Sequence, residues 1–149
     1  MPLNKRILFN VRSTGSIPDA TSVGNSFNSS KKSTLDLHST RNRTTRASYL
    51  PSAGSNFIGF VEGIRVIVSS ISSATKITIK VTTGADGTDI VIPDTEATIA
   101  LEVGSTTSGA AVFNLNKFPW ANSTDKLYVF FKTDTGTLTV DKTFITWSQ

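Results

Sequence analysis

The chain has 149 residues, no cysteine, one histidine and a formal net charge of +4. The missing cysteine excludes disulfide bonds and thiolate metal sites. No apolar run approaches the roughly 20 residues that cross a bilayer, and Met1–Asn10 lacks the apolar stretch of a signal peptide. We therefore expect no membrane partner, and a protein that is made in a cytosol and kept there or packed into a particle.

The charge divides the chain into two parts. Residues 1–55 hold eight basic and two acidic side chains, a net charge of +6, whereas residues 56–149 hold seven basic and nine acidic ones, a net charge of −2. From Ser13 to Ser55, Ser and Thr fill 17 of 43 positions. This asymmetry predicts a basic Ser/Thr-rich arm over residues 1–55 and a folded domain over residues 56–149.

The predicted arm begins with Lys5–Arg12, a plausible strand that pairs either with the folded domain or with a neighbouring subunit. Beyond it, apolar residues such as Val23, Phe27 and Leu35 are too sparse to bury a face. Such a segment cannot offset the entropy lost on ordering, so we expect it to be extended by itself. Its scattered large apolar residues are then expected to anchor it on a surface that another molecule supplies.

From Asn56 onward the sequence predicts β-strands and no helix. The expected strands are Phe57–Ser70, Thr75–Thr82, Asp89–Ile92, Ala97–Leu101, Ala111–Leu115, Lys126–Lys132 and Thr137–Trp147. Thr75–Thr82 alternates apolar and polar residues and predicts a strand with one wet face. Phe57–Ser70 has apolar residues on both parities, which predicts cover on both faces in its second half.

Two local irregularities are expected near the end of the chain. Leu138 and Val140 lie on one parity of the last strand, and Ile145 and Trp147 lie on the other. A bulge near Asp141–Thr143 would bring both pairs to the same core. The connection Lys132–Thr137 contains Asp134 and Gly136 between two β-prone runs and predicts a tight hairpin. Short strands at even spacing then predict an all-β fold, a jelly-roll-type β-sandwich with an extended N-terminal arm. An immunoglobulin-like sandwich is the alternative.

No residue pattern indicates catalysis, a metal ion or a cofactor, so we expect a protein that is not an enzyme. The single histidine, His38, lies in the polar arm, which would not hold it to the tolerance that catalysis requires. The acidic residues Asp86, Asp89, Asp94 and Glu96 lie close together in the sequence but lack the spacing of a calcium-binding loop. Gly84–Gly87 is more simply a turn between strands.

Two kinds of binding surface remain as candidates. Trp120 and Tyr128 are candidates for an aromatic platform for a glycan, although the Phe118-Pro119-Trp120 loop more often closes the end of a sandwich core. The arm is expected to contact a neighbouring protein, with nucleic acid as the less favoured partner because its charge is not dense. The contacting residues are Lys5, Arg6, Arg12, Lys31, Lys32, Arg41, Arg43, Arg46 and Tyr49.

Residues 125–140, DKLYVFFKTDTGTLTV, resemble the closing hairpin of small phage virion proteins. Together with an arm followed by a jelly roll, the layout is similar to that of phage capsid decoration (cement) proteins. The resemblance implies a homo-trimer on the capsid surface of a virion, made in the host cytoplasm, whose arm braces neighbouring major capsid proteins. The alternatives are a small jelly-roll coat protein or another tail- or fibre-associated virion protein, with a surface that contacts nucleic acid or glycan.

Overall fold

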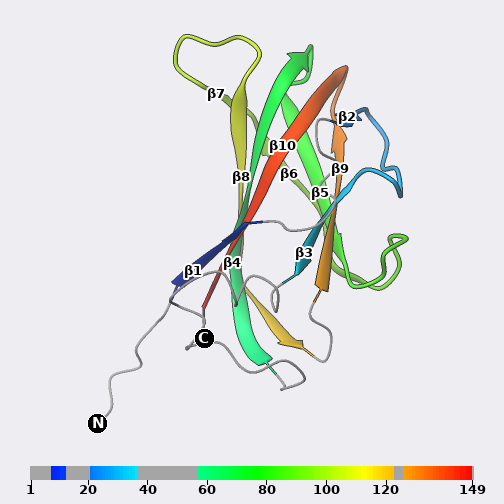
Figure 1. Cartoon of the computed structure of the whole chain (residues 1–149), viewed down its shortest axis with the longest axis vertical. Coiled ribbons are helices and arrows are strands. Elements are labelled where there is room, and N and C mark those ends of the chain that lie inside the picture. Colours follow the sequence, from blue (N-terminus) through cyan, green and yellow to red (C-terminus); the bar gives the residue numbers. More distant parts are fainter. Residues whose placement is uncertain (1–7, 13–20, 37–56, 123–125, 149) are drawn as a thin grey trace.

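The computed structural model describes residues 8–12, 21–36, 57–122 and 126–148, and these ranges contain strands and no helix. The all-β prediction is therefore confirmed. In chain order the strands are β1 (Leu8–Arg12), β2 (Thr21–Val23), β3 (Lys32–Asp36), β4 (Phe57–Ser72), β5 (Lys76–Thr82), β6 (Ile90–Thr98), β7 (Ala100–Leu101), β8 (Gly109–Asn122), β9 (Lys126–Thr133) and β10 (Thr137–Ser148) (Figure 1).

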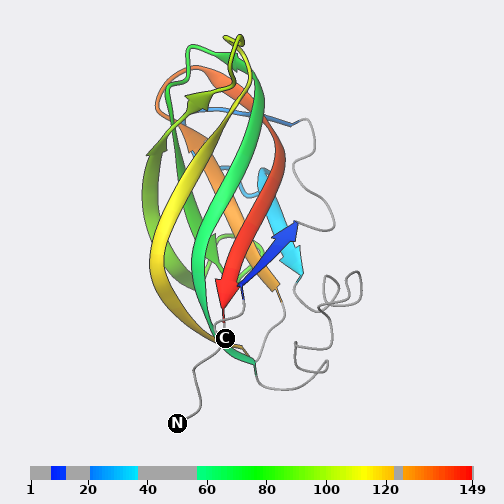
Figure 2. The same cartoon turned by 90° about the vertical axis from the view of Figure 1, so that its left-hand side faces the viewer.

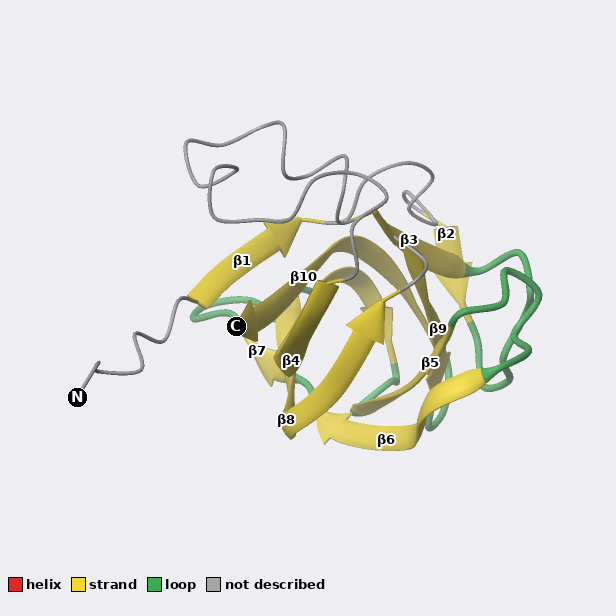
Figure 3. Cartoon of the chain, turned by 90° about the horizontal axis from the view of Figure 1, so that it is seen from below, coloured by secondary structure: helices red, strands yellow, loops and turns green. Residues whose placement is uncertain are grey.

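The strands form two antiparallel sheets that enclose one core. The first sheet has six strands in the order β1-β10-β4-β8-β7, with β2 also paired to β10. Its strands β10, β4 and β8 run side by side along the long axis of the molecule (Figure 2). The second sheet has four strands in the order β3-β9-β5-β6, and the view from below shows the two sheets facing each other (Figure 3).

The strand pairs are nested in the sequence. β5 pairs with β6, β4 with β8, β3 with β9, and β1 and β2 both pair with β10. Rolling up one long hairpin with such nested pairs gives two Greek keys and a jelly roll. The predicted jelly-roll-type sandwich is confirmed, and this order differs from that of the immunoglobulin fold.

The segment that we predicted as an arm supplies three of the strands. β1 pairs with residues 144–148 of β10 and β2 with residues 138–140, so together they occupy the place of one interrupted edge strand. β3 forms the edge of the second sheet beside β9. Val23 from β2 is 1% exposed and belongs to the core. Residues 21–36 are therefore ordered by pairing with β9 and β10 of the same chain, and not by a surface of another molecule.

The core lies between the inward faces of the sheets and is built from aliphatic and aromatic side chains at alternate positions. The largest fully buried ones include Phe113, Phe131, Ile64, Ile77, Ile79, Leu127 and Leu138. Burying one such side chain contributes roughly 1.5–3 kcal/mol relative to leaving it in water. The alternation predicted for Thr75–Thr82 is confirmed, since Ile77, Ile79 and Val81 are buried and Lys76 is exposed.

The predicted bulge in β10 is confirmed. The pairing of β10 with β4 shifts register between Val140 and Lys142, and both Val140 and Thr143 are buried as a result. Thr143 Oγ1 lies 2.8 Å from Ser33 Oγ on β3, and this buried hydrogen bond joins the two sheets. This pair helps to fix how β3 sits opposite β10.

The hairpin predicted at Lys132–Thr137 is wrong. The turn is tight, with Thr133 Oγ1 donating to Gly136 O at 2.9 Å and Gly136 at a φ of 62°. However, β9 belongs to the second sheet and β10 to the first, so the turn crosses between sheets. A Cβ on Gly136 would lie 1.9 Å from Ser72 O. The glycine is therefore required both by its backbone conformation and by the close approach of β4.

Candidate functional site

Three of the nine residues predicted to contact a neighbouring protein lie within the described ranges. Arg12 ends β1, Lys31 precedes β3, and Lys32 is its first residue. Lys31 Nζ donates to Ser22 O at 2.5 Å, and Lys32 Nζ donates to Ser29 O at 2.7 Å. These two lysines therefore hold the connection between β2 and β3. The other predicted contacts lie outside the described residues: Lys5, Arg6, Arg41, Arg43, Arg46 and Tyr49.

The outer face of the second sheet carries two aromatic rings and three ammonium groups, called here the Phe27 cluster: Phe27, Lys32, Lys80, Phe130 and Lys132. Lys80 Nζ lies 4.7 Å from the Phe27 ring centroid and 5.3 Å from that of Phe130. Lys132 Nζ also lies 4.7 Å from the Phe27 centroid, and Lys32 Nζ lies 5.8 Å from that of Phe130. A cation over a ring face is attracted by the negative face of the π system.

Strand register explains how the Phe27 cluster forms. Lys80 on β5 is directly opposite Phe130 on β9, and both side chains point away from the core because their neighbours in sequence point into it. Phe130 is 1% exposed although it lies on this outer face. The connection between β2 and β3, which carries Phe27, is also tied to β9 by a hydrogen bond from Thr133 N to Gly24 O at 2.8 Å. The cluster thus fastens this connection over the sheet.

The two aromatic residues proposed as a glycan platform lie on different sheets. Tyr128 is on β9 in the second sheet, paired with Thr34 and Thr82, and it is half-buried. Trp120 is on β8 in the first sheet, paired with Gly59, and its side chain lies outside what the structure describes. A shared platform of these two residues stays a prediction.

Three of the four acidic residues that are close in sequence, Asp86, Asp94 and Glu96, have separate partners. Asp94 Oδ2 lies 3.6 Å from Lys132 Nζ, and Glu96 Oε1 lies 3.4 Å from Lys76 Nζ. Asp86 accepts hydrogen bonds from Thr88 Oγ1 and Thr88 N, and the bond from the hydroxyl is the main cause that lowers the pKa of Asp86. Within the described residues, no group of three His, Cys, Asp or Glu side chains is placed to hold a metal ion.

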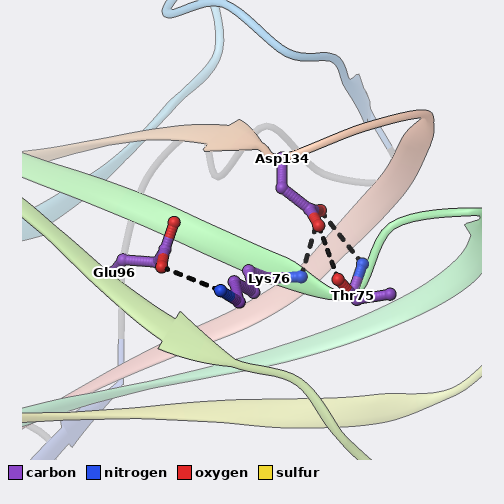
Figure 4. A network of polar contacts seen from close by, with 4 residues as sticks. All are labelled: Thr75, Lys76, Glu96 and Asp134. Atoms are coloured by element: carbon purple, nitrogen blue, oxygen red, sulfur yellow. Dashed lines mark hydrogen bonds and ion pairs between the residues drawn. The ribbon is translucent and has the colours of Figure 1, made fainter.

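The carboxylate of Asp134 accepts three hydrogen bonds from the start of β5 and the residue before it (Figure 4). Its Oδ1 accepts from Thr75 N at 3.0 Å and from Lys76 N at 3.1 Å, while its Oδ2 accepts from Thr75 Oγ1. These bonds, led by that from the Thr75 hydroxyl, hold the pKa of Asp134 well below its ordinary value. Asp134 thereby ties the turn between the sheets to the start of β5.

The outer face of the first sheet contains an open hollow of about 310 Å³. Its lining residues come from β4, β7, β8 and the positions next to them: Arg65, Ile67, Ala100, Glu102, Gly109 and Ala110. Val112, which is opposite Arg65 in the strand register, stands beside the hollow and is 66% exposed. From the sequence, only the β4 part of this surface could be predicted. Apolar residues such as Ile67 alternate there with the core residues and so indicated a second apolar face.

Comparisons with protein-family models, with curated proteins and with solved structures found no match to this chain. Among the described residues, no helix is long and apolar enough to cross a membrane. The function is therefore inferred from the fold, from the two outer faces of the sandwich and from the sequence.

Proposed function

We propose that this chain is a structural protein of a phage particle, a capsid decoration (cement) protein that binds to the outside of a shell and braces neighbouring major capsid proteins. The observation that carries the proposal is the nested strand pairing of a jelly roll, a fold that viral capsid proteins use. The resemblance of residues 125–140 to small phage virion proteins is a second ground for the proposal and concerns the sequence alone, since residues 126–140 cross between the sheets and form no hairpin.

The position of the basic residues narrows which of them contact the shell. Lys31 and Lys32 already donate to carbonyl groups of their own chain. Arg41, Arg43 and Arg46 belong to residues 37–56, the long connection between β3 and β4. Guanidinium groups bind carboxylates with two parallel hydrogen bonds, so this connection is the part of the chain that we assign to the capsid contact. Repetition over a shell strengthens such contacts by multivalency.

The test is binding of the purified protein to shells that lack decoration, measured by co-sedimentation. We expect the wild type to pellet with shells and the R41A/R43A variant to bind at least tenfold more weakly. The variant K76A/K126A removes the same charge from the folded body and should bind as the wild type does. A wild type that stays in the supernatant, or two variants that lose binding equally, would contradict the proposal.

The second candidate is a small coat protein, or a tail- or fibre-associated protein, that contacts nucleic acid or glycan. The three lysines of the Phe27 cluster are the observation that favours a polyanion. Two of them are already engaged, because Lys132 is near Asp94 and Lys32 donates to Ser29 O. For this reason we rank it second. A filter-binding assay decides, since contacts with phosphates make nucleic-acid affinity fall steeply with salt.

A further inference from the structure

The outward residues of β10, β4, β8 and β7 form two adjacent rows across the first sheet. In one row Lys142, Ile67, Ala110 and Ala100 follow one another in register. In the next row Phe144, Arg65 and Val112 do so. The centre of this face is thus apolar, with Ile67 and Ala110 half-buried and Val112 exposed, although the double parity of β4 predicted cover on both of its faces.

The shape of this face combines a hollow with a projection. Small residues at Ala100, Gly109 and Ala110 form the low part. Gly109 cannot be replaced without a shift, because a Cβ there would lie 2.3 Å from Ala100 O. Beside this low part Val112 projects, with 66% of its surface in contact with water. On a rotated copy of the chain, the same Val112 side chain would face this hollow, which is large enough to take an aliphatic side chain.

The charges on the rim of the hollow are also arranged so that they can pair with those of a second copy. Arg65 comes from β4 and Glu102 follows β7, and both line the hollow. Among the described residues no ion pair involves either of them, and the Arg65 guanidinium instead lies 5.6 Å from the Phe144 ring centroid. The rim of the hollow therefore carries one cation and one anion, neither in an ion pair with a described residue, on opposite sides of an apolar centre, and Lys142 lies farther across the sheet on β10. In a two-fold interface each of these charges meets its opposite on the other copy.

We propose that two copies of this chain pair through the outer face of the first sheet around a two-fold axis. Val112 of each copy enters the hollow of the other, and Arg65 of each copy pairs with Glu102 of the other. A partner of uniform charge would leave one of the two rim charges unpaired, whereas a second copy pairs both. The inference goes beyond the proposed function and does not depend on it. It replaces the trimer that the family resemblance implies with a dimer.

The first test is the oligomeric state of the full chain, measured by sedimentation velocity over a concentration series. We expect a monomer–dimer equilibrium for the wild type and a monomer for Val112→Asp, because the carboxylate would be buried in the hollow. Ile90→Asp is the matched control, since Ile90 is 56% exposed on β6 in the second sheet. This variant should dimerise as the wild type does.

The second test is a charge exchange, which keeps the inference testable if Val112→Asp affects folding. R65E and E102R should each raise the dimer dissociation constant by roughly tenfold, because each places two like-charged pairs in the interface. The double variant R65E/E102R restores both pairs and should recover most of the affinity. A wild type that is monomeric or trimeric at all concentrations overturns the inference, as does a double variant no better than either single one.

The result of the dimerisation tests can be distinguished from the result of the shell-binding test. A dimer that fails to bind shells would remove the cement function and leave the interface in place. A monomer that binds shells would do the reverse. Both measurements use the same full-length protein.

Discussion

At the scale of single residues, Asp134 shows how a side chain in a turn can organise a fold. Its carboxylate accepts hydrogen bonds from two backbone N–H groups and one hydroxyl of Thr75 and Lys76, which are 59 and 58 residues away in the sequence, respectively. The backbone also pairs here, since Asp134 N donates to Lys76 O at 3.2 Å. Hydrogen bonds to a charged acceptor contribute more to stability than those between neutral groups. The turn between the sheets is therefore anchored to β5 by charge.

The variant Asp134→Asn tests this anchor. We expect the free energy of unfolding at pH 7 to fall by about 1 kcal/mol, because the amide keeps one acceptor oxygen but loses the charge. The hydrogen bonds lower the pKa of the folded carboxylate, so its contribution is full above the ordinary carboxyl pKa of about 4 and is lost as the pH falls below it. Urea denaturation at pH 7 and at pH 3 should show the difference from wild type narrowing at the lower pH.

Glu96→Gln is the control for this prediction, because Glu96 lies in the same neighbourhood and pairs with Lys76 at 3.4 Å (Figure 4). Both side chains of this pair are about half exposed, so its loss should change the free energy of unfolding by less than about 0.5 kcal/mol. Equal effects of the two substitutions would mean that the Asp134 hydrogen bonds add nothing beyond a surface charge.

At the scale of elements, local patterns identified strands but not their partners. The alternation of β5 and the parity change in β10 were visible in the sequence because each depends on neighbouring residues. The hairpin between β9 and β10 was predicted wrongly because Asp134 and Gly136 suit any tight turn, and whether the chain crosses between sheets depends on distant contacts with Ser72 and Thr75. The Phe27 cluster was missed for the same reason, since its rings and ammonium groups come from three separate segments.

The Phe27 cluster predicts that the connection between β2 and β3 is held by its aromatic ring. Phe27→Ala should lower the free energy of unfolding by about 1–2 kcal/mol, because two cation–π contacts and the apolar cover of the sheet are lost. Amide hydrogen exchange should rise first in residues 24–31. Phe27→Leu keeps most of the apolar area and should lie between the alanine variant and the wild type. A leucine variant as stable as the wild type would leave burial as the only contribution of the ring.

At the scale of the whole molecule, composition did not reveal that the described parts of residues 1–55 supply three strands of the two sheets. Ser and Thr are frequent and apolar residues few in the described residues 21–36, because edge strands need little apolar area of their own. β2 adds Val23 to the core, and β3 adds the buried Ser33 that bonds Thr143 across the sandwich. The nested pairing then requires both ends of the chain, because β1 and β2 close the first sheet against the final strand, β10.

This topology predicts that residues 57–149 do not fold as an independent domain. The fragment would lack β1, β2 and β3, which leaves the outer edges of β9 and β10 unpaired and uncovers core residues such as Leu127 and Leu138. We expect it to aggregate or to unfold without a cooperative transition, as unprotected strand edges favour association. Residues 8–149 keep every described strand and should unfold within about 0.5 kcal/mol of the full chain. Circular dichroism during urea denaturation distinguishes the two, and a cooperative transition in the shorter fragment would return β1 to β3 to the role of an arm.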